Sequence, residues 1–111
     1  MSNVKIIAIP VRGNSSEFKV SKLFARSPYF VIYDEKSKSK TLIANKFKDE
    51  HSQSGKSIAK LLVARGVNTF CGFEIGYNVQ KIAEENNIQL IILKEEESTT
   101  GSKIIDLISR K

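Results

Sequence analysis

The feature that most constrains the fold is a change in hydrophobic period near residue 54. Before that point, short runs of apolar, β-branched and aromatic residues predict strands at 4–11, 29–33 and 41–44. After it, apolar residues recur at helical spacing in three segments. These are separated by a buried-strand pattern at 67–71 and a continuous apolar strand at 88–93. The order is therefore strand, hairpin, helix, strand, helix, strand, helix, which is typical of an α/β protein.

This order also predicts the sheet. The polar turn 34–40 joins two strands as a hairpin, which makes one strand antiparallel. Strands joined through helices run parallel, through right-handed crossovers. We therefore expect a five-stranded mixed sheet with one antiparallel strand and helices on both faces, a three-layer α/β/α arrangement. The 111 residues contain no linker or internal repeat, so residues 1–111 are expected to form a single domain.

The helix boundaries carry local signals. Gly66 stands where the first helix should stop, and Asn86 with Asn87 supplies a left-handed cap for the second. Thr99 or Thr100 can cap the third helix at its start. The segment 12–27 is polar and is expected to be a long loop with at most a short strand.

Composition places the chain among ordinary globular proteins, with 41% hydrophobic and 27% charged residues. The single cysteine, Cys71, excludes an internal disulfide framework and any four-cysteine metal site within one chain. The first residues have no signal-peptide pattern, and no apolar run approaches the ~18 residues that a membrane span needs. These features predict a reduced, cytoplasmic protein with no membrane association.

The charge is uneven along the chain. Residues 1–66 carry 13 Lys and Arg against 5 Asp and Glu, whereas residues 67–111 carry 5 against 7. The lysines are scattered rather than packed into a block, as in the stretch 36–48. Such a surface attracts anions in general, so nucleic-acid binding is permitted but not indicated.

Two enzyme classes fit poorly. Ser54–Gly55–Lys56–Ser57 has the ending of a phosphate-binding loop, but Glu50 stands where that motif needs its first glycine, so the segment is interpreted as a helix start. The chain order resembles that of ribonuclease H, whose two-metal chemistry needs clustered carboxylates. The first strand, 4–11, contains no acidic residue, and Glu74 stands alone after the fourth strand.

Nucleophilic catalysis has little support. His51 is the only histidine and lies in a polar stretch beside Asp49 and Glu50, as a solvated loop residue would. Cys71 ends a buried strand, where thiols are usually inert packing groups. Nothing in their spacing favours a Cys–His dyad, and the chain is expected not to be an enzyme.

The segment Phe70–Asn78 is the most informative stretch, because it runs from a strand through two glycines into a helix. In open α/β sheets ligands favour the crevice beyond the carboxyl ends of the strands. There Gly72 and Gly76 would permit close backbone approach, and the N–H groups of the next helix would attract an anion. The alternative is a tight turn with nothing bound.

Three segments together resemble the dinitrogenase iron-molybdenum cofactor biosynthesis family, the nitrogenase accessory-factor domain. Residues 24–34 (FARSPYFVIYD) are similar to the family's HFGRAPYF-type segment. Residues 54–67 (SGKSIAKLLVARGV) are similar to its GAGK-A-LL-GV helix, and residues 72–78 (GFEIGYN) to its GEIGPNA loop. The likeness extends over residues 4–93, nearly the whole chain.

The resemblance implies a ribonuclease H-like domain without ribonuclease chemistry, which binds or carries an iron–sulfur or iron–molybdenum-type cluster precursor. It points to a set of cofactor-binding candidates: Arg26, Cys71, Gly72, Glu74, Gly76 and Asn78. The main prediction is a non-enzymatic carrier of a metal-cluster precursor or similar anionic cargo. The alternative is a metal-free interaction or regulatory module that binds a protein partner or a small anion.

The chain departs from the family pattern at two positions. Leu23 replaces a histidine that is a suspected cluster contact, and Ala25 replaces a glycine. A soft metal needs thiolate or imidazole ligands, which only Cys71 and His51 can supply, so these two are the candidate metal ligands. Weak contact with a cluster, binding across a homodimer, and a different anion all stay open.

Overall fold

The computed structural model of the protein describes residues 4–49, 54–94 and 99–109. A five-stranded sheet lies at its centre. The strand order in this sheet is β3-β2-β1-β4-β5. The strands are β1 (Ile6–Val11), β2 (Tyr29–Asp34), β3 (Ser39–Ala44), β4 (Thr69–Gly72) and β5 (Gln89–Ile92). The helices are α1 (Ser54–Ala64), α2 (Tyr77–Glu85) and α3 (Gly101–Ser109).

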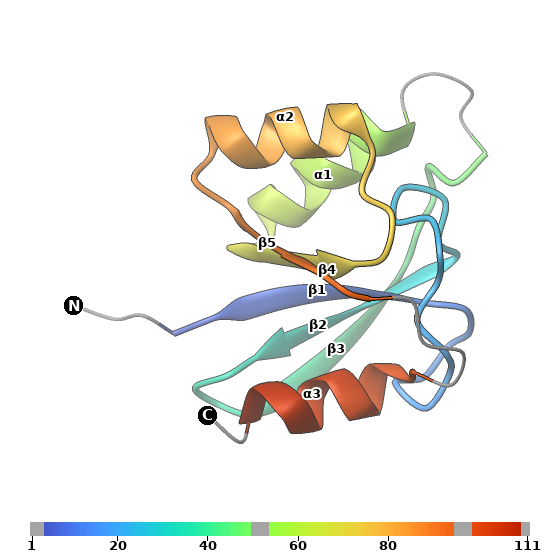
Figure 1. Cartoon of the computed structure of the whole chain (residues 1–111), viewed down its shortest axis with the longest axis vertical. Coiled ribbons are helices and arrows are strands. Elements are labelled where there is room, and N and C mark those ends of the chain that lie inside the picture. Colours follow the sequence, from blue (N-terminus) through green and yellow to red (C-terminus); the bar gives the residue numbers. More distant parts are fainter. Residues whose placement is uncertain (1–3, 50–53, 95–98, 110–111) are drawn as a thin grey trace.

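Strand direction agrees with the prediction from the sequence. β2 pairs antiparallel with both β1 and β3, whereas β1, β4 and β5 pair in parallel. Only β2 therefore runs against the other strands of this sheet. Figure 1 shows α1 and α2 on one side of the sheet and α3 on the other, so the three-layer α/β/α arrangement is confirmed.

Successive side chains of each strand point to opposite faces of the sheet, and this divides the interior into two cores. The α1/α2 core lies between the sheet and helices α1 and α2, and its buried residues include Phe24, Phe30, Phe70, Ile58, Leu62 and Val79. The α3 core lies under α3, and its buried residues include Ile7, Ile9, Val31, Tyr33, Cys71, Ile104 and Ile105. Neighbouring residues of β4 point to opposite faces, so Phe70 and Cys71 belong to different cores.

Segment 12–28 is more ordered than a plain loop. It contributes isolated bridges at Val20, which pairs with Val11, and at Leu23, which pairs in parallel with Glu74. Ser27 is buried, and the Val11 and Tyr29 carbonyl oxygens both lie within hydrogen-bond distance of its hydroxyl, whose single proton is donated to one of them or shared between them. These long-range contacts hold the segment against the end of the sheet, which polar composition alone did not indicate.

The predicted helix boundaries are confirmed. Gly66, two residues beyond the end of α1, has a φ of 87°, and Asn87, two residues beyond the end of α2, has a φ of 57°, both in the left-handed region. At the start of α3 the Lys103 N–H donates to Thr100 Oγ1 at 3.1 Å, so Thr100 is the capping residue. Within the described ranges no helix is both long and apolar enough to cross a membrane.

Candidate functional site

The loop that follows β4 lies at the end of the sheet where β1 and β4 finish. Its Glu74 is paired with the 22–24 segment, because the Phe24 N–H donates to the Glu74 carbonyl and the Glu74 N–H donates to the Lys22 carbonyl, each at 3.1 Å. Leu23 and Glu74 thus form a short parallel bridge. Two segments about fifty positions apart in sequence are therefore fixed side by side by their backbones.

Gly55 marks the point where all three family-like segments meet. A Cβ on Gly55 would lie 3.2 Å from Val79 Cγ2, 3.6 Å from Ala25 Cβ and 3.7 Å from Asn78 Cβ. The start of α1, the start of α2 and the 24–27 turn are consequently in contact. The departure at Ala25 lies at this junction, where a methyl group fits at ordinary van der Waals distance.

The two glycines of the loop have different environments. Gly72 is buried, and a Cβ there would lie 3.3 Å from the Phe24 ring and 3.6 Å from Ile75. The inside of the bend is thus filled by protein side chains. Gly76 is exposed, and a Cβ there would meet nothing within 4 Å. Direct access from solvent exists at Gly76, together with exposed Glu74 and Asn78, and not at Gly72.

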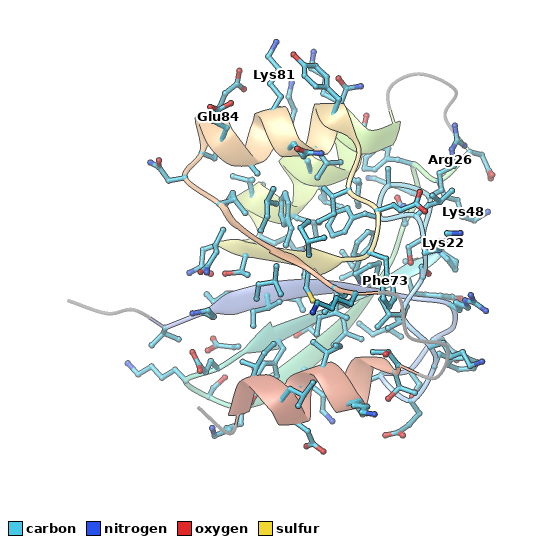
Figure 2. All side chains as sticks on the ribbon, viewed as in Figure 1. Lys22, Arg26, Lys48, Phe73, Lys81 and Glu84 are labelled. Atoms are coloured by element: carbon cyan, nitrogen blue, oxygen red, sulfur yellow. The ribbon has the colours of Figure 1, made fainter. Side chains whose placement is uncertain are left out.

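Basic side chains surround this loop. Figure 2 shows Lys22, Arg26 and Lys48 at the same end of the molecule. Lys22 Nζ lies 3.8 Å from a Glu74 carboxylate oxygen, but both side chains are more than half exposed, so solvent screens this pair strongly. Arg26 Nη1 donates to the Lys48 carbonyl at 3.0 Å. One arginine thus joins the 24–27 turn to the segment after β3 while remaining exposed.

Asn45 is a site-supporting residue that the sequence analysis did not identify. It is 3% exposed, and its side-chain Nδ2 donates to the Ala25 and Ser27 carbonyls, each at 2.9 Å. Its Oδ1 accepts the Phe47 N–H at 2.9 Å. A single buried amide therefore fixes the turn that carries Arg26. The available signal was an asparagine directly after a strand, which is common in turns and does not by itself indicate burial.

The Cys71 side chain points to the α3 side of the sheet, opposite the side on which the Phe24 ring packs. The cysteine is fully buried in the α3 core, and burial raises the pKa of the thiol from 9.0 to about 12. The thiolate is the form that binds metal, and at neutral pH this cysteine stays protonated. A role for Cys71 as a ligand remains a prediction, and it requires a rearrangement that exposes the sulfur.

His51, the second predicted metal ligand, lies outside the described residues. Among residues that are described, no three or more His, Cys, Asp or Glu side chains gather as a metal site would need. The candidate site therefore offers exposed cations, backbone groups and one amide, Asn78. Such a surface can hold an anion but does not supply a ready set of metal ligands.

Comparison with solved structures confirms the fold. The apo form of the orange protein from Desulfovibrio gigas is similar with a TM-score of 0.85 and 17% identity, over 97% of this chain and 89% of that one. A NifB-like protein from Thermotoga is similar with a TM-score of 0.80 and 28% identity, over 96% of this chain and 88% of that one. No curated protein sequence is significantly similar to this chain.

The family comparison extends over nearly the whole sequence. Residues 5–109 match the model of the family described as dinitrogenase iron-molybdenum cofactor. This span includes every described strand and helix as well as the three segments that meet at Gly55. The chain belongs to the dinitrogenase iron-molybdenum cofactor family.

Proposed function

We propose that this protein is a non-enzymatic carrier that holds an anionic metal-cluster precursor on the exposed surface around the β4–α2 loop. We call this the cargo surface and define it by six residues: Lys22, Arg26, Lys48, Glu74, Gly76 and Asn78. The observation that carries the proposal is the meeting of the three family-like segments at Gly55. Segments that are far apart in sequence build one surface there. Its described cations are Lys22, Arg26 and Lys48. Lys22 and Lys48 are each in a solvent-exposed pair with an acid, Glu74 and Asp49, so the net charge of the surface is weakly positive.

Charge rather than coordination by the protein is the proposed means of holding the cargo. Iron–sulfur-type clusters are anionic, and Arg26 presents a planar guanidinium that can make charge-assisted hydrogen bonds to sulfide or oxide groups. The first turn of α2 adds N–H groups, because Gly76 at its N-cap has no side chain to cap them and that turn contains no acid. In this proposal the cluster keeps its own inorganic ligands while it is carried.

The electrostatic attraction that holds the cargo also accounts for its release. A complex held by exposed charges weakens as ionic strength rises, because the Debye length is only about 8 Å at physiological salt. A carrier benefits from that property, since its cargo must leave. We therefore expect reversible binding that is sensitive to salt, rather than the tight retention that thiolate ligands would give.

The test is reconstitution of the purified protein with iron and sulfide in the absence of oxygen. We expect a visible charge-transfer band that co-elutes with the protein and is lost at high salt. Arg26→Ala should lower the affinity by about tenfold, the amount expected for one charged hydrogen bond. Arg65→Ala is the matched control, because Arg65 is also exposed but lies just beyond the far end of α1.

Cys71→Ala separates the two ways of holding a cluster. If charge holds the cargo, this variant keeps the band and its salt dependence. Loss of the band in Cys71→Ala, with Arg26→Ala unaffected, would show that the thiol is a ligand after all. A colourless protein that retains no iron under any of these conditions would contradict the carrier proposal. A rise in melting temperature with inorganic phosphate alone would then favour the metal-free alternative.

A further inference from the structure

The two edges of the sheet differ in how they are protected. β3 forms one edge; Lys40 lies within this strand, and the turn before it carries Lys36 and Lys38. Lysines on an edge strand oppose pairing with another chain. β5 forms the other edge, and its four residues Gln89–Ile92 carry no charge. Ile92 is 58% exposed there. The β5 edge is short, and it has no charged residue that would oppose pairing with another strand.

A hollow of about 470 Å³ lies beside this edge, between α2 and β5. Its lining includes Tyr77, Lys81 and Glu84 from one face of α2, and Ile88 and Leu90 from the chain that enters and forms β5. Tyr77 is 76% exposed, which leaves a large aromatic ring in solvent. This face is thus neither purely charged nor purely apolar, as is usual for surfaces that bind other proteins.

The order of side chains along this face is self-complementary. From the start of α2 toward β5 the face presents an aromatic residue, Tyr77, then the cation Lys81, the anion Glu84 and the apolar Ile88. If the same face is placed against itself in the antiparallel direction, Lys81 comes opposite Glu84 and Tyr77 comes opposite Ile88. A twofold axis generates each of these pairs twice.

We propose that a second copy of this chain docks on this face, with the two β5 strands pairing antiparallel about a twofold axis to form a continuous ten-stranded sheet. Adjacent strands lie about 4.8 Å apart, and helices that cover the last strands of each sheet then approach at about 10 Å. That spacing suits direct contact between α2 and its symmetry mate. The α2 helices meet on the same side of the joined sheet, because the axis is perpendicular to it.

Charge favours a second copy over other partners. The face carries one cation and one anion, so a nucleic acid or a strongly acidic peptide gains little from it. Neither Lys81 nor Glu84 has a salt-bridge partner within the described chain, so both are available across the axis. The excess positive charge lies in residues 1–66, whereas residues 67–111, which form α2 and β5, are nearly balanced. Repulsion between copies is therefore smallest at this edge.

A charge-swap experiment tests the dimer. Sedimentation velocity of the untreated protein over a range of concentrations should show a monomer–dimer equilibrium that needs no metal. Lys81→Glu places two glutamates opposite each other at both contacts, and we expect about a tenfold weaker dimer. Glu84→Lys should have a similar effect. The double variant Lys81→Glu/Glu84→Lys restores opposite charges and should return the affinity to near that of the unmodified chain.

Two further variants distinguish an effect at the β5 edge from a general effect of surface charge on dimer affinity. Ile92→Lys adds a charge at the β5 edge and should abolish the dimer, whereas Lys40→Glu on β3 should leave it unchanged. All these positions are exposed, so far-UV circular dichroism should stay the same. A protein that is monomeric at every concentration, or a dimer that ignores the swaps and Ile92→Lys, would overturn the proposal. The readout is mass without cargo, so this result does not depend on the carrier function.

Discussion

The two cores on either side of the sheet have different relations to the candidate site. The α1/α2 core contains Phe24, whose ring lies 5.0 Å from that of Phe30 and 5.2 Å from that of Phe70 between centroids. The backbone of Phe24 is bonded to Glu74 in the candidate loop, and its ring closes over Gly72. The α3 core contains Tyr33 and Cys71, and it meets that loop at Phe73, which is partly buried against it.

This difference assigns separate tasks to the two cores. One core supports the sheet and at the same time fixes the cargo surface, because the ring of Phe24 packs in this core while its backbone N–H donates to Glu74 of the cargo surface. The other core supports the sheet and contacts the loop at Phe73, which is not one of the six residues of the cargo surface. A substitution in the α1/α2 core at Phe24 should therefore alter stability and cargo binding together, whereas one in the α3 core away from Phe73 should alter stability only. The predictions below test that separation.

Phe24→Ala should have the largest effect. Removal of a fully buried ring from between two others costs about 3–5 kcal/mol in the free energy of unfolding. The 22–24 segment then loses its anchor, so cargo binding should fall even in the fraction that stays folded. Urea unfolding measures the first effect, and anaerobic titration under native conditions measures the second. A destabilised protein with unchanged cargo affinity would break the proposed link between this core and the site.

Ile104→Ala is the matched change in the α3 core. Ile104 is 4% exposed, and its truncation should cost about 2–3 kcal/mol, less than loss of the phenylalanine. Because the α3 core meets the candidate loop at Phe73, which is not one of the residues of the cargo surface, the affinity for cargo should remain within twofold of the original. The same unfolding and titration measurements apply. If Ile104→Ala weakened cargo binding as strongly as Phe24→Ala, the two cores could not be treated as independent.

Cys71 makes the α3 core sensitive to alkaline pH. The pKa of its thiol is about 12 in the folded chain against 9.0 as the ordinary value, so below pH 9 both states keep the proton. Between pH 9 and 12 the unfolded chain binds fewer protons, and the free energy of unfolding falls by at most about 1.4 kcal/mol per pH unit. Cys71→Ala lacks this contribution.

The measurement is urea unfolding of both proteins at pH 8 and pH 10. We expect the protein with Cys71 to lose up to about 1.4 kcal/mol more than Cys71→Ala over this interval. The same burial should make alkylation of native Cys71 at pH 8 as slow as opening of the core. Parallel pH profiles, or rapid alkylation of the folded protein, would show that the thiol reaches solvent.

The architecture could be predicted from sequence because each element carries its own local signal. Period and β-branched content located all five strands, and Gly66 and Thr100 marked helix boundaries through backbone geometry that depends on near neighbours. The single antiparallel strand followed from the polar turn between residues 33 and 41. Family motifs then identified the segments of the site. These inferences needed no knowledge of distant contacts.

The arrangement within the site could not be predicted in the same way. Both faces of β4 are covered, so the pattern around Cys71 did not indicate which core would receive the thiol. Gly72 and Gly76 are similar in sequence, but packing against Phe24 and Pro10, both far away in the chain, and against nearby Ile75 closes the first, whereas the second stays open. Burial of Asn45 likewise depends on carbonyl groups from another segment. Such long-range packing leaves no local pattern.

Substitutions at Gly72 and Gly76 are expected to have the smallest effects on stability. They compare a closed and an open position within the same loop. Gly76 has a φ of −70° and a ψ of 172°, which any residue can adopt, and it is an N-cap without a side-chain hydrogen bond. Gly76→Ser should therefore stabilise the protein slightly, by at most about 0.5 kcal/mol, since serine and glycine differ little at an N-cap. Gly72→Ser should instead destabilise it, because the new Cβ would press on the Phe24 ring.

Cargo binding then distinguishes the two positions further. If cargo approaches the backbone at the start of α2, Gly76→Ser should weaken binding while stability is kept, which core packing cannot explain. Thermal unfolding and anaerobic titration of the two serine variants supply the comparison. Unchanged binding in Gly76→Ser would remove Gly76 from the cargo surface and confine recognition to the charged side chains. The α1/α2 core would then fix the cargo surface only by positioning Arg26 and its neighbours.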